Sequence, residues 1–134
     1  MIIGIGIDVA EVSRYAFDET KLARFAKKVF TEAEMAHALK HRHFAERLAG
    51  AFAAKEATRK AFGHAIPWRS MGVRHERSGK PYMELTGRSS TLPALRGVRG
   101  MHLSITHTKT TAVAVLILEG DELSSAASSE VAAR

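Results

Sequence analysis

The sequence contains no cysteine, and this absence excludes a disulfide framework, a thiolate metal site and a cysteine nucleophile. Any metal that the protein binds must therefore take oxygen or imidazole ligands. The chain also lacks an apolar run of the roughly 20 residues that a membrane-spanning helix needs, and its first residues lack the basic segment of a signal peptide. We therefore expect a cytoplasmic protein with no membrane partner.

Acidic side chains are in the minority. The 134 residues include 20 Lys or Arg and 14 Asp or Glu, a formal net charge of +6, and between Lys21 and Lys60 ten basic residues face only four acidic ones. A cationic chain of this kind favours an anionic partner, which can be a nucleic acid, a phosphorylated small molecule or an acidic protein. A hydrophobic content of 46% at this length predicts one folded domain.

The first ten residues predict a β-strand with two different faces. Isoleucines and a valine alternate from Ile3 to Val9 on one face, and the other face carries Gly4, Gly6 and Asp8. Glycine weakens a strand, so two glycines on the face of an acid indicate that something approaches the backbone closely there. Asp8 is either part of a site at the end of this gap or a strand-end residue that caps the following turn.

The middle of the chain predicts three helices. Apolar residues recur at helical spacing over residues 18–29 with basic residues between them, which indicates a basic amphipathic helix. Thr31 and Glu34 form a capping-box pattern, so a second helix begins there and runs to about Lys40. The alanine-rich segment Phe44–Phe62 predicts a long core helix that ends at the following glycine.

The last third of the chain is mostly predicted as strands. Residues 72–76 and 81–85 flank a Ser-Gly-Lys turn and predict a β-hairpin, and residues 91–95 predict a short helix. Residues 101–106 alternate and indicate a half-buried strand. Residues 111–118 are apolar on both faces, which is typical of the central strand of a sheet.

The order of these elements predicts an α+β fold. A helix-rich middle packed on an antiparallel sheet from both ends of the chain differs from the regular alternation of a doubly wound sheet. We assign residues 1–119 to the folded domain and residues 120–134, which are rich in serine and alanine, to a flexible tail.

Glu56 and Lys60 lie one helical turn apart, so their side chains share a face. The ordinary interpretation is a surface salt bridge, which contributes only about 0.3 to 0.5 kcal/mol. The alanines around the pair either leave room for a ligand or serve plain helix packing. Asp8 and Glu56 are two carboxylates from different elements, which favours a hard cation such as Mg²⁺, and a neighbouring lysine suits a phosphate ester.

His107 follows a predicted strand and precedes hydroxyl and ammonium groups in residues 108–111. This cluster is either a binding site or a structural hydrogen-bond network. The same alternatives hold for the polar strand face formed by His102, Ser104 and Thr106.

Three segments in order along the chain closely resemble the motifs of the holo-[acyl-carrier-protein] synthases, which are phosphopantetheinyl transferases. The segments are Gly4-Ile5-Gly6-Ile7-Asp8, Phe52-Ala53-Ala54-Lys55-Glu56-Ala57-Thr58-Arg59-Lys60 and Ser104-Ile105-Thr106-His107-Thr108. The resemblance implies Mg²⁺-dependent transfer of 4′-phosphopantetheine from coenzyme A to a serine of an acyl carrier protein, with release of adenosine 3′,5′-bisphosphate. It also implies a compact α+β domain that assembles as a homotrimer with active sites at subunit interfaces.

By this resemblance Asp8 and Glu56 are the magnesium ligands, and Glu56 and Lys60 are the catalytic residues. Lys60 stabilises the departing phosphate, and either Glu56 or a metal-bound water takes the serine proton. The implied coenzyme A contacts are Lys60, Lys80, Pro81, His107 and Thr108.

The chain departs from the family pattern at Ala51, where many relatives have an arginine. Arg47 lies one helical turn earlier on the same face, and we expect its guanidinium to supply the missing contact to coenzyme A. The carrier-protein surface implied by the resemblance comprises Arg14, Lys21, Arg24, Phe25 and Lys28. Carrier proteins are acidic, so an acyl carrier protein, free or as a domain of a fatty acid synthase, accounts for the basic excess without a nucleic acid.

Two other functions fit individual features of the sequence. The basic helices alone fit a nucleic-acid-binding module, whose affinity would fall steeply with salt and need no metal. Asp8, Glu56 and His107 as three metal ligands fit a phosphohydrolase that attacks coenzyme A with water.

Overall fold

The structure, a computed structural model, describes residues 1–16 and 18–121. Most of the predicted tail of residues 120–134 therefore lies outside the described residues. None of the helices in these residues combines the length and the hydrophobicity that a membrane-spanning segment requires. Helices and antiparallel strands share one core, which confirms the predicted α+β fold.

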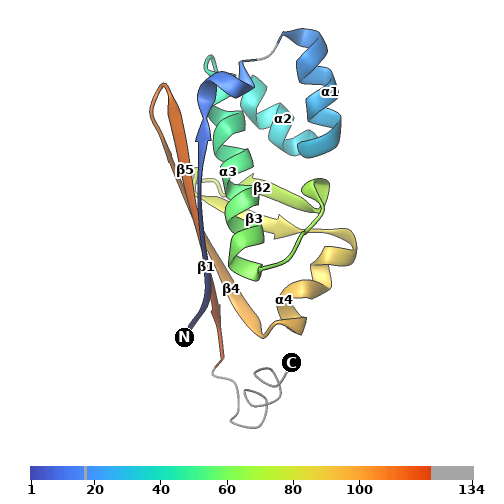
Figure 1. Cartoon of the computed structure of the whole chain (residues 1–134), viewed down its shortest axis with the longest axis vertical. Helices are drawn as coiled ribbons and strands as arrows, with labels where there is room; N and C mark the ends of the chain where they lie inside the picture. Colours follow the sequence, from blue (N-terminus) through green and yellow to red (C-terminus); the bar gives the residue numbers. More distant parts are fainter. Residues whose placement is uncertain (17, 122–134) are drawn as a thin grey trace.

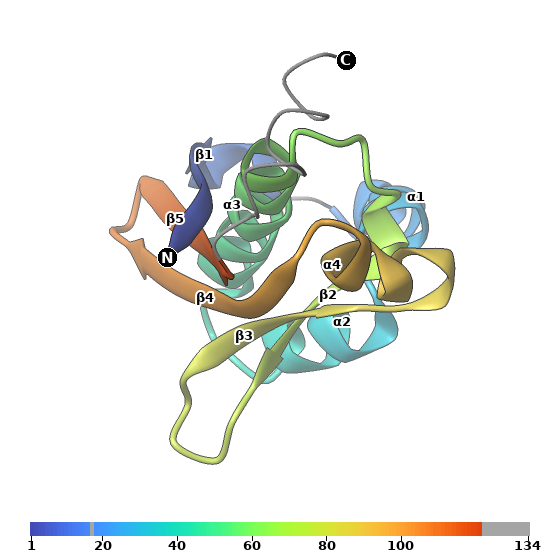
Figure 2. The ribbon, with the colours of Figure 1, turned by 90° about the horizontal axis from the view of Figure 1, so that it is seen from below.

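Helix α3 (Phe44–Phe62) lies at the centre of the molecule and has the predicted bounds. It ends at Gly63, whose φ of 63° closes the helix in a left-handed conformation that glycine adopts without strain. Figures 1 and 2 show α3 with a three-stranded sheet along one side and the hairpin of β2 (Met71–His75) and β3 (Pro81–Leu85) on the other.

The three-stranded sheet is antiparallel throughout and has the order β1 (Ile2–Glu11), β5 (Thr111–Gly120), β4 (Val98–His107). The central position of β5 confirms the prediction from its apolar residues. Its alanines and leucines at even positions from 112 to 118 are buried on the side of α3. The strand runs past the predicted end into the expected tail because Gly120 exchanges two hydrogen bonds of 2.9 Å with Met1.

The glycines of β1 allow this strand to pack closely against α3. A Cβ built on Gly4 would lie 2.6 Å from the carbonyl oxygen of Ala61, and one built on Gly6 would overlap the carbonyl group of Ala57. The group that approaches the strand is therefore the helix backbone, so the predicted close approach is confirmed and no gap is left at these glycines. At Ala57 and Ala61 the alternative of plain helix packing is confirmed.

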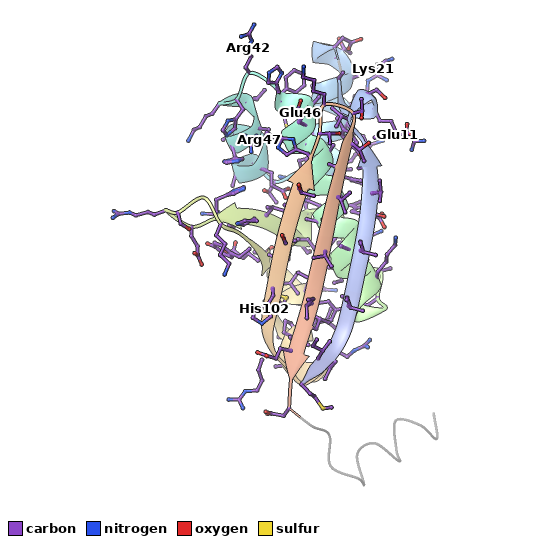
Figure 3. The ribbon with its side chains drawn as sticks, turned by 90° about the vertical axis from the view of Figure 1, so that its left-hand side faces the viewer. Glu11, Lys21, Arg42, Glu46, Arg47 and His102 are labelled. Carbon is purple, nitrogen blue, oxygen red and sulfur yellow. The ribbon has the colours of Figure 1, made fainter. Side chains whose placement is uncertain are left out.

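The opposite face of β1 is uncovered. Ile5, Ile7 and Val9 are 57 to 62% exposed, and Figure 3, which looks onto this face, shows no other element in front of it. These side chains pair across the strands with half-buried apolar residues of β5. Together they form what we call the outer sheet face: Ile5, Ile7, Val9, Val113, Val115 and Ile117.

The chain after β1 forms the 3-10 turn η1 (Val12–Tyr15) and two helices, α1 (Glu19–Val29) and α2 (Glu32–Leu39). The predicted capping box of α2 is present: Thr31 Oγ1 accepts a 3.2 Å hydrogen bond from the Glu34 amide, and Glu34 Oε1 accepts one of 2.9 Å from the Thr31 amide.

A buried ion pair fastens α2 and α3 to the hairpin. The Lys55 ammonium lies 2.6 Å from Glu34 Oε1 and donates to the carbonyl oxygens of Val29 and Met71 at 2.7 and 2.8 Å. Glu34 Oε2 accepts a 2.8 Å hydrogen bond from the Val73 amide. Burial lowers the pKa of Lys55, and the carboxylate of Glu34 opposes that shift. Lys55, which belongs to one of the sequence motifs, thus serves the fold.

The hairpin has the predicted position, and its turn contains Gly79 with a φ of 91°. The short 3-10 turn η2 (Trp68–Ser70) precedes it. The short helix predicted at residues 91–95 is confirmed as one turn of α-helix, α4 (Leu92–Leu95), and the 3-10 turn η3 (Gly87–Thr91) precedes it.

Candidate active site

Lys60 and Asp8 are joined across the contact between α3 and β1. The Lys60 ammonium donates hydrogen bonds of 3.0 Å to Asp8 Oδ1 and to the carbonyl oxygen of Ile7. The ordinary interpretation of Glu56 and Lys60 as a surface salt bridge is therefore wrong, because Lys60 pairs with the strand aspartate. Close packing of β1 on α3 brings these groups together, so Gly4 and Gly6 contribute indirectly to the site.

The charges of Asp8 and Glu56 both affect the pKa of the hydroxyl of Tyr15, a residue of η1. Burial raises the pKa of this hydroxyl well above its ordinary value, and the negative charges of Asp8 and Glu56 raise it further, whereas Arg14 opposes them. Charge effects of this kind weaken with distance, so both carboxylates lie within electrostatic range of the Tyr15 hydroxyl. Glu56 and Lys60 lie one turn apart on α3 and Lys60 pairs with Asp8, so the three side chains lie in one region of the molecule. Their roles in a reaction stay predictions.

The donor set of this region fits one hard divalent cation. Asp8 and Glu56 offer carboxylate oxygens, and the Asp8 side chain is 17% exposed. Mg²⁺ is commonly held by one or two carboxylates and completes its coordination with water and phosphate oxygens. Within residues 1–16 and 18–121 no group of three His, Cys, Asp or Glu side chains is placed to hold a metal. The residues therefore fit a magnesium ion shared with a phosphate-bearing substrate.

A cavity of about 150 Å³ lies beside the first two turns of α3. Its lining includes Arg47 and Ala51 of α3, His75 and Pro81 of the hairpin, and His107 of β4. Arg47, Pro81 and His107 are three of the predicted coenzyme A contacts. Arg47 and Ala51 border the same space, which is the arrangement required if the Arg47 guanidinium replaces an arginine at position 51.

His107 is paired with α3. Its Nδ1 lies 3.1 Å from Glu46 Oε2, and Figure 3 shows Glu46 and Arg47 beside the end of β4. The Thr108 hydroxyl accepts hydrogen bonds of 3.2 and 3.1 Å from the amides of Thr110 and Thr111, which closes the turn between β4 and β5. These hydrogen bonds make the Thr108 hydroxyl part of a structural network, which is one of the two alternatives that the sequence left open for the cluster after His107.

The carboxylates and the cavity are separate groups within one chain. Asp8, Glu56 and Lys60 are not among the residues that line the cavity, and neither are Lys80 and Thr108. The three metal ligands required by the phosphohydrolase alternative are therefore not assembled by the described part of a single chain.

The predicted carrier-protein surface lies at the end of the molecule that bears α1. Four of its five side chains are exposed, namely Arg14, Lys21, Arg24 and Lys28. Phe25 is half-buried, because its ring packs edge-on against Tyr15 at 5.9 Å and Phe30 at 5.7 Å. Phe25 therefore contributes to the aromatic core beneath this surface.

Sequence reasoning missed several residues of these sites. Tyr15 has no motif around it, and only the fold brings its hydroxyl to the two carboxylates. The opposite holds for Arg59, which belongs to a motif but has a structural role. Its guanidinium stacks on the Trp68 ring at 3.4 Å and donates to the Ile66 carbonyl oxygen at 2.8 Å. His37 and His75 line the cavity although they are 38 positions apart in the sequence.

Comparison with known proteins places these features in a family context. The model of the 4′-phosphopantetheinyl transferase superfamily matches residues 4–128. The holo-[acyl-carrier-protein] synthase of Treponema denticola is 41% identical over 127 residues, which cover 90% of this chain and 100% of that protein.

Solved structures agree with this match. The holo-(acyl-carrier-protein) synthase of Bacillus anthracis in complex with CoA (3′,5′-ADP) is 35% identical, with a TM-score of 0.71 over 90% of this chain and 99% of that one. The corresponding enzyme of Neisseria meningitidis is 30% identical, with a TM-score of 0.79 over 89% of this chain and 99% of that one.

Proposed function

The chain belongs to the 4′-phosphopantetheinyl transferase superfamily, among its holo-[acyl-carrier-protein] synthases, and from this premise we propose that it transfers 4′-phosphopantetheine from coenzyme A to an acyl carrier protein. A serine oxygen of the carrier attacks the phosphorus that bears pantetheine, and the bond to the bridging pyrophosphate oxygen breaks. Adenosine 3′,5′-bisphosphate leaves, and the serine loses its proton. The observation that carries the proposal is the pairing of Lys60 with Asp8 on the face of α3 that also carries Glu56.

Asp8 and Glu56 are the proposed magnesium ligands. When bound, Mg²⁺ supplies charge neutralisation and orientation at the pyrophosphate. Lys60 is held by the Ile7 carbonyl oxygen while its side chain remains 54% exposed, so its ammonium can also reach a phosphate oxygen and stabilise the leaving group. Glu56, the carboxylate that Lys60 does not pair with, accepts the serine proton in this proposal.

We further propose that the active enzyme is a homotrimer with active sites between subunits. The outer sheet face exposes an apolar surface that soluble monomers rarely leave open. Within one chain, the carboxylates of Asp8 and Glu56 do not line the cavity beside α3 that is proposed to bind coenzyme A. A homotrimer that buries the outer sheet faces and sets the cavity of one subunit beside the carboxylates of the next would account for both features.

The acidic carrier protein is proposed to dock on the basic surface of Arg14, Lys21, Arg24 and Lys28, next to the site at Tyr15. Lys80 and Thr108 are proposed to reach the coenzyme A from outside the cavity once the subunits assemble. Coenzyme A is an intracellular metabolite, so the proposed place of the reaction is the cytoplasm.

Intact-mass spectrometry tests the proposed function. The protein is incubated with coenzyme A, Mg²⁺ and an apo acyl carrier protein, and the expected result is a carrier heavier by one phosphopantetheine group. Omission of Mg²⁺ and a carrier with the acceptor serine replaced by alanine serve as controls, and neither should gain mass. Cleavage of coenzyme A without any gain in carrier mass would instead support the phosphohydrolase.

A further inference from the structure

Two histidines of the cavity have no part in the proposed chemistry. His37 of α2 and His75 of β2 both line the cavity, and their rings stack with centroids 3.9 Å apart and planes 14° from parallel. His41 packs edge-on against His37 at 5.0 Å. Arg47 borders the same space from α3. Besides His107, which pairs with Glu46, the cavity therefore presents two further imidazoles and a guanidinium from three separate elements.

The acids near this stack are engaged elsewhere. Glu34 holds Lys55, and Glu46 pairs with His107. Arg47 forms no ion pair with another residue in the part of the chain that the structure describes. The charged or titratable groups that face His37 come from four elements or their ends: Glu34, Lys40 and His41 of α2, Glu46 and Arg47 of α3, His75 of β2 and His107 of β4.

These surroundings keep the stack neutral in the free protein. Burial lowers the pKa of His37 to about 4, and the neighbouring bases, His75, His41, Arg47 and Lys40 in that order, lower it further. The pKa of His75 is lowered by burial and by Arg47 and His41. Both imidazoles are therefore uncharged near neutral pH, and an anion that enters the cavity would remove the electrostatic obstacle to protonation.

We propose that the stacked imidazoles of His37 and His75, together with Arg47, bind the phosphate monoester of the co-substrate and take up a proton as it binds. The inference rests on the proposed function, because coenzyme A carries a single phosphate monoester, its 3′-phosphate. A monoester carries close to two negative charges near pH 7, whereas each phosphate of the pyrophosphate carries one. The monoester is therefore the group that gains most from a second positive charge.

The alanine at position 51 explains why a positive charge beyond that of Arg47 comes from protonation of the histidine stack. With alanine at this position, Arg47 is the guanidinium that faces the cavity from α3. A proton added to the histidine stack on binding supplies a further positive charge only when the phosphate is present. The free protein thus avoids a permanent repulsion between Arg47 and a charged imidazole.

Calorimetric titration measures the proton directly. Coenzyme A and 3′-dephospho-coenzyme A are titrated into the protein at pH 7.5 in two buffers that differ in ionisation enthalpy, so that the difference in heat counts the protons taken up. Wild type is expected to take up about one proton with coenzyme A, and none with the dephospho form. His37→Gln and His75→Gln should each lose this uptake and bind coenzyme A about 10-fold more weakly. Their affinity for 3′-dephospho-coenzyme A should not change.

His64→Gln is the matched control, because His64 is exposed and outside the cavity, and it should behave as wild type. Normal transfer to the carrier without proton uptake, or with equal affinity for the two ligands, overturns this inference and leaves the proposed function in place. Failure to bind coenzyme A at all, together with no transfer, overturns both.

Discussion

Replacement of Gly6 by alanine tests how β1 is held against α3. The added methyl group would overlap the carbonyl group of Ala57, so the strand and helix must separate by something on the order of 1 Å. Overpacking typically costs about 1 to 3 kcal/mol and occasionally more, while removal of a strand glycine returns about 0.5 to 1 kcal/mol. Because both partners are backbone and neither can rotate away, we take the upper end of this cost and expect a net loss of about 2 kcal/mol.

Urea unfolding followed by circular dichroism measures this loss, and Gly72→Ala is the matched control. Gly72 is also a buried strand glycine, but a Cβ there would meet its nearest neighbour, a methyl group of Thr31, at an ordinary 3.6 Å. Gly72→Ala should therefore change the free energy of unfolding by less than about 1 kcal/mol. Equal effects of the two substitutions would refute the view that Gly6 is required for the approach of α3.

Three further predictions concern the fold, the assembly and the cavity. Lys55→Met leaves the buried Glu34 carboxylate without its cation and should cost about 3 to 5 kcal/mol in urea unfolding, while a double variant with Glu34→Gln should recover part of that loss. Ile5→Asp should convert the proposed trimer to monomers in analytical ultracentrifugation and abolish transfer, and a variant that stays trimeric would contradict the proposed role of the outer sheet face. Arg47→Ala should raise the Michaelis constant for coenzyme A about 10-fold with little change in kcat, whereas Arg42→Ala, an exposed arginine outside the cavity, should leave it unchanged.

Local patterns predicted most of the secondary structure because its signals are short-range. The bounds of α3 follow from a run of good helix formers closed by Gly63, and the start of α2 follows from the capping box at Thr31. The central place of β5 follows from its apolar faces. Each of these three features depends on residues that are close together in the sequence, so the sequence displays its signal directly.

Long-range features were not predictable in the same way. The glycines of β1 indicated a close approach but not the identity of the approaching group, which is the backbone of α3. The spacing of Glu56 and Lys60 indicated a helical pair, whereas tertiary structure gives Lys60 a different partner, Asp8. The stack of His37 on His75 depends on how α2 meets the hairpin. Pattern reasoning fails at such positions because the partner comes from a distant segment.

Asp8 and Glu56 are proposed to serve the reaction and not the fold. Asp8→Ala and Glu56→Ala are assayed by carrier-protein mass gain over a range of Mg²⁺ concentrations, with urea unfolding run in parallel. Both sites border solvent and neither carboxylate belongs to the buried core, so the free energy of unfolding should change by less than about 1 kcal/mol. We predict loss of transfer in both variants with the fold intact. Transfer at the wild-type rate and with the wild-type Mg²⁺ dependence in either variant would contradict the proposed role of that carboxylate.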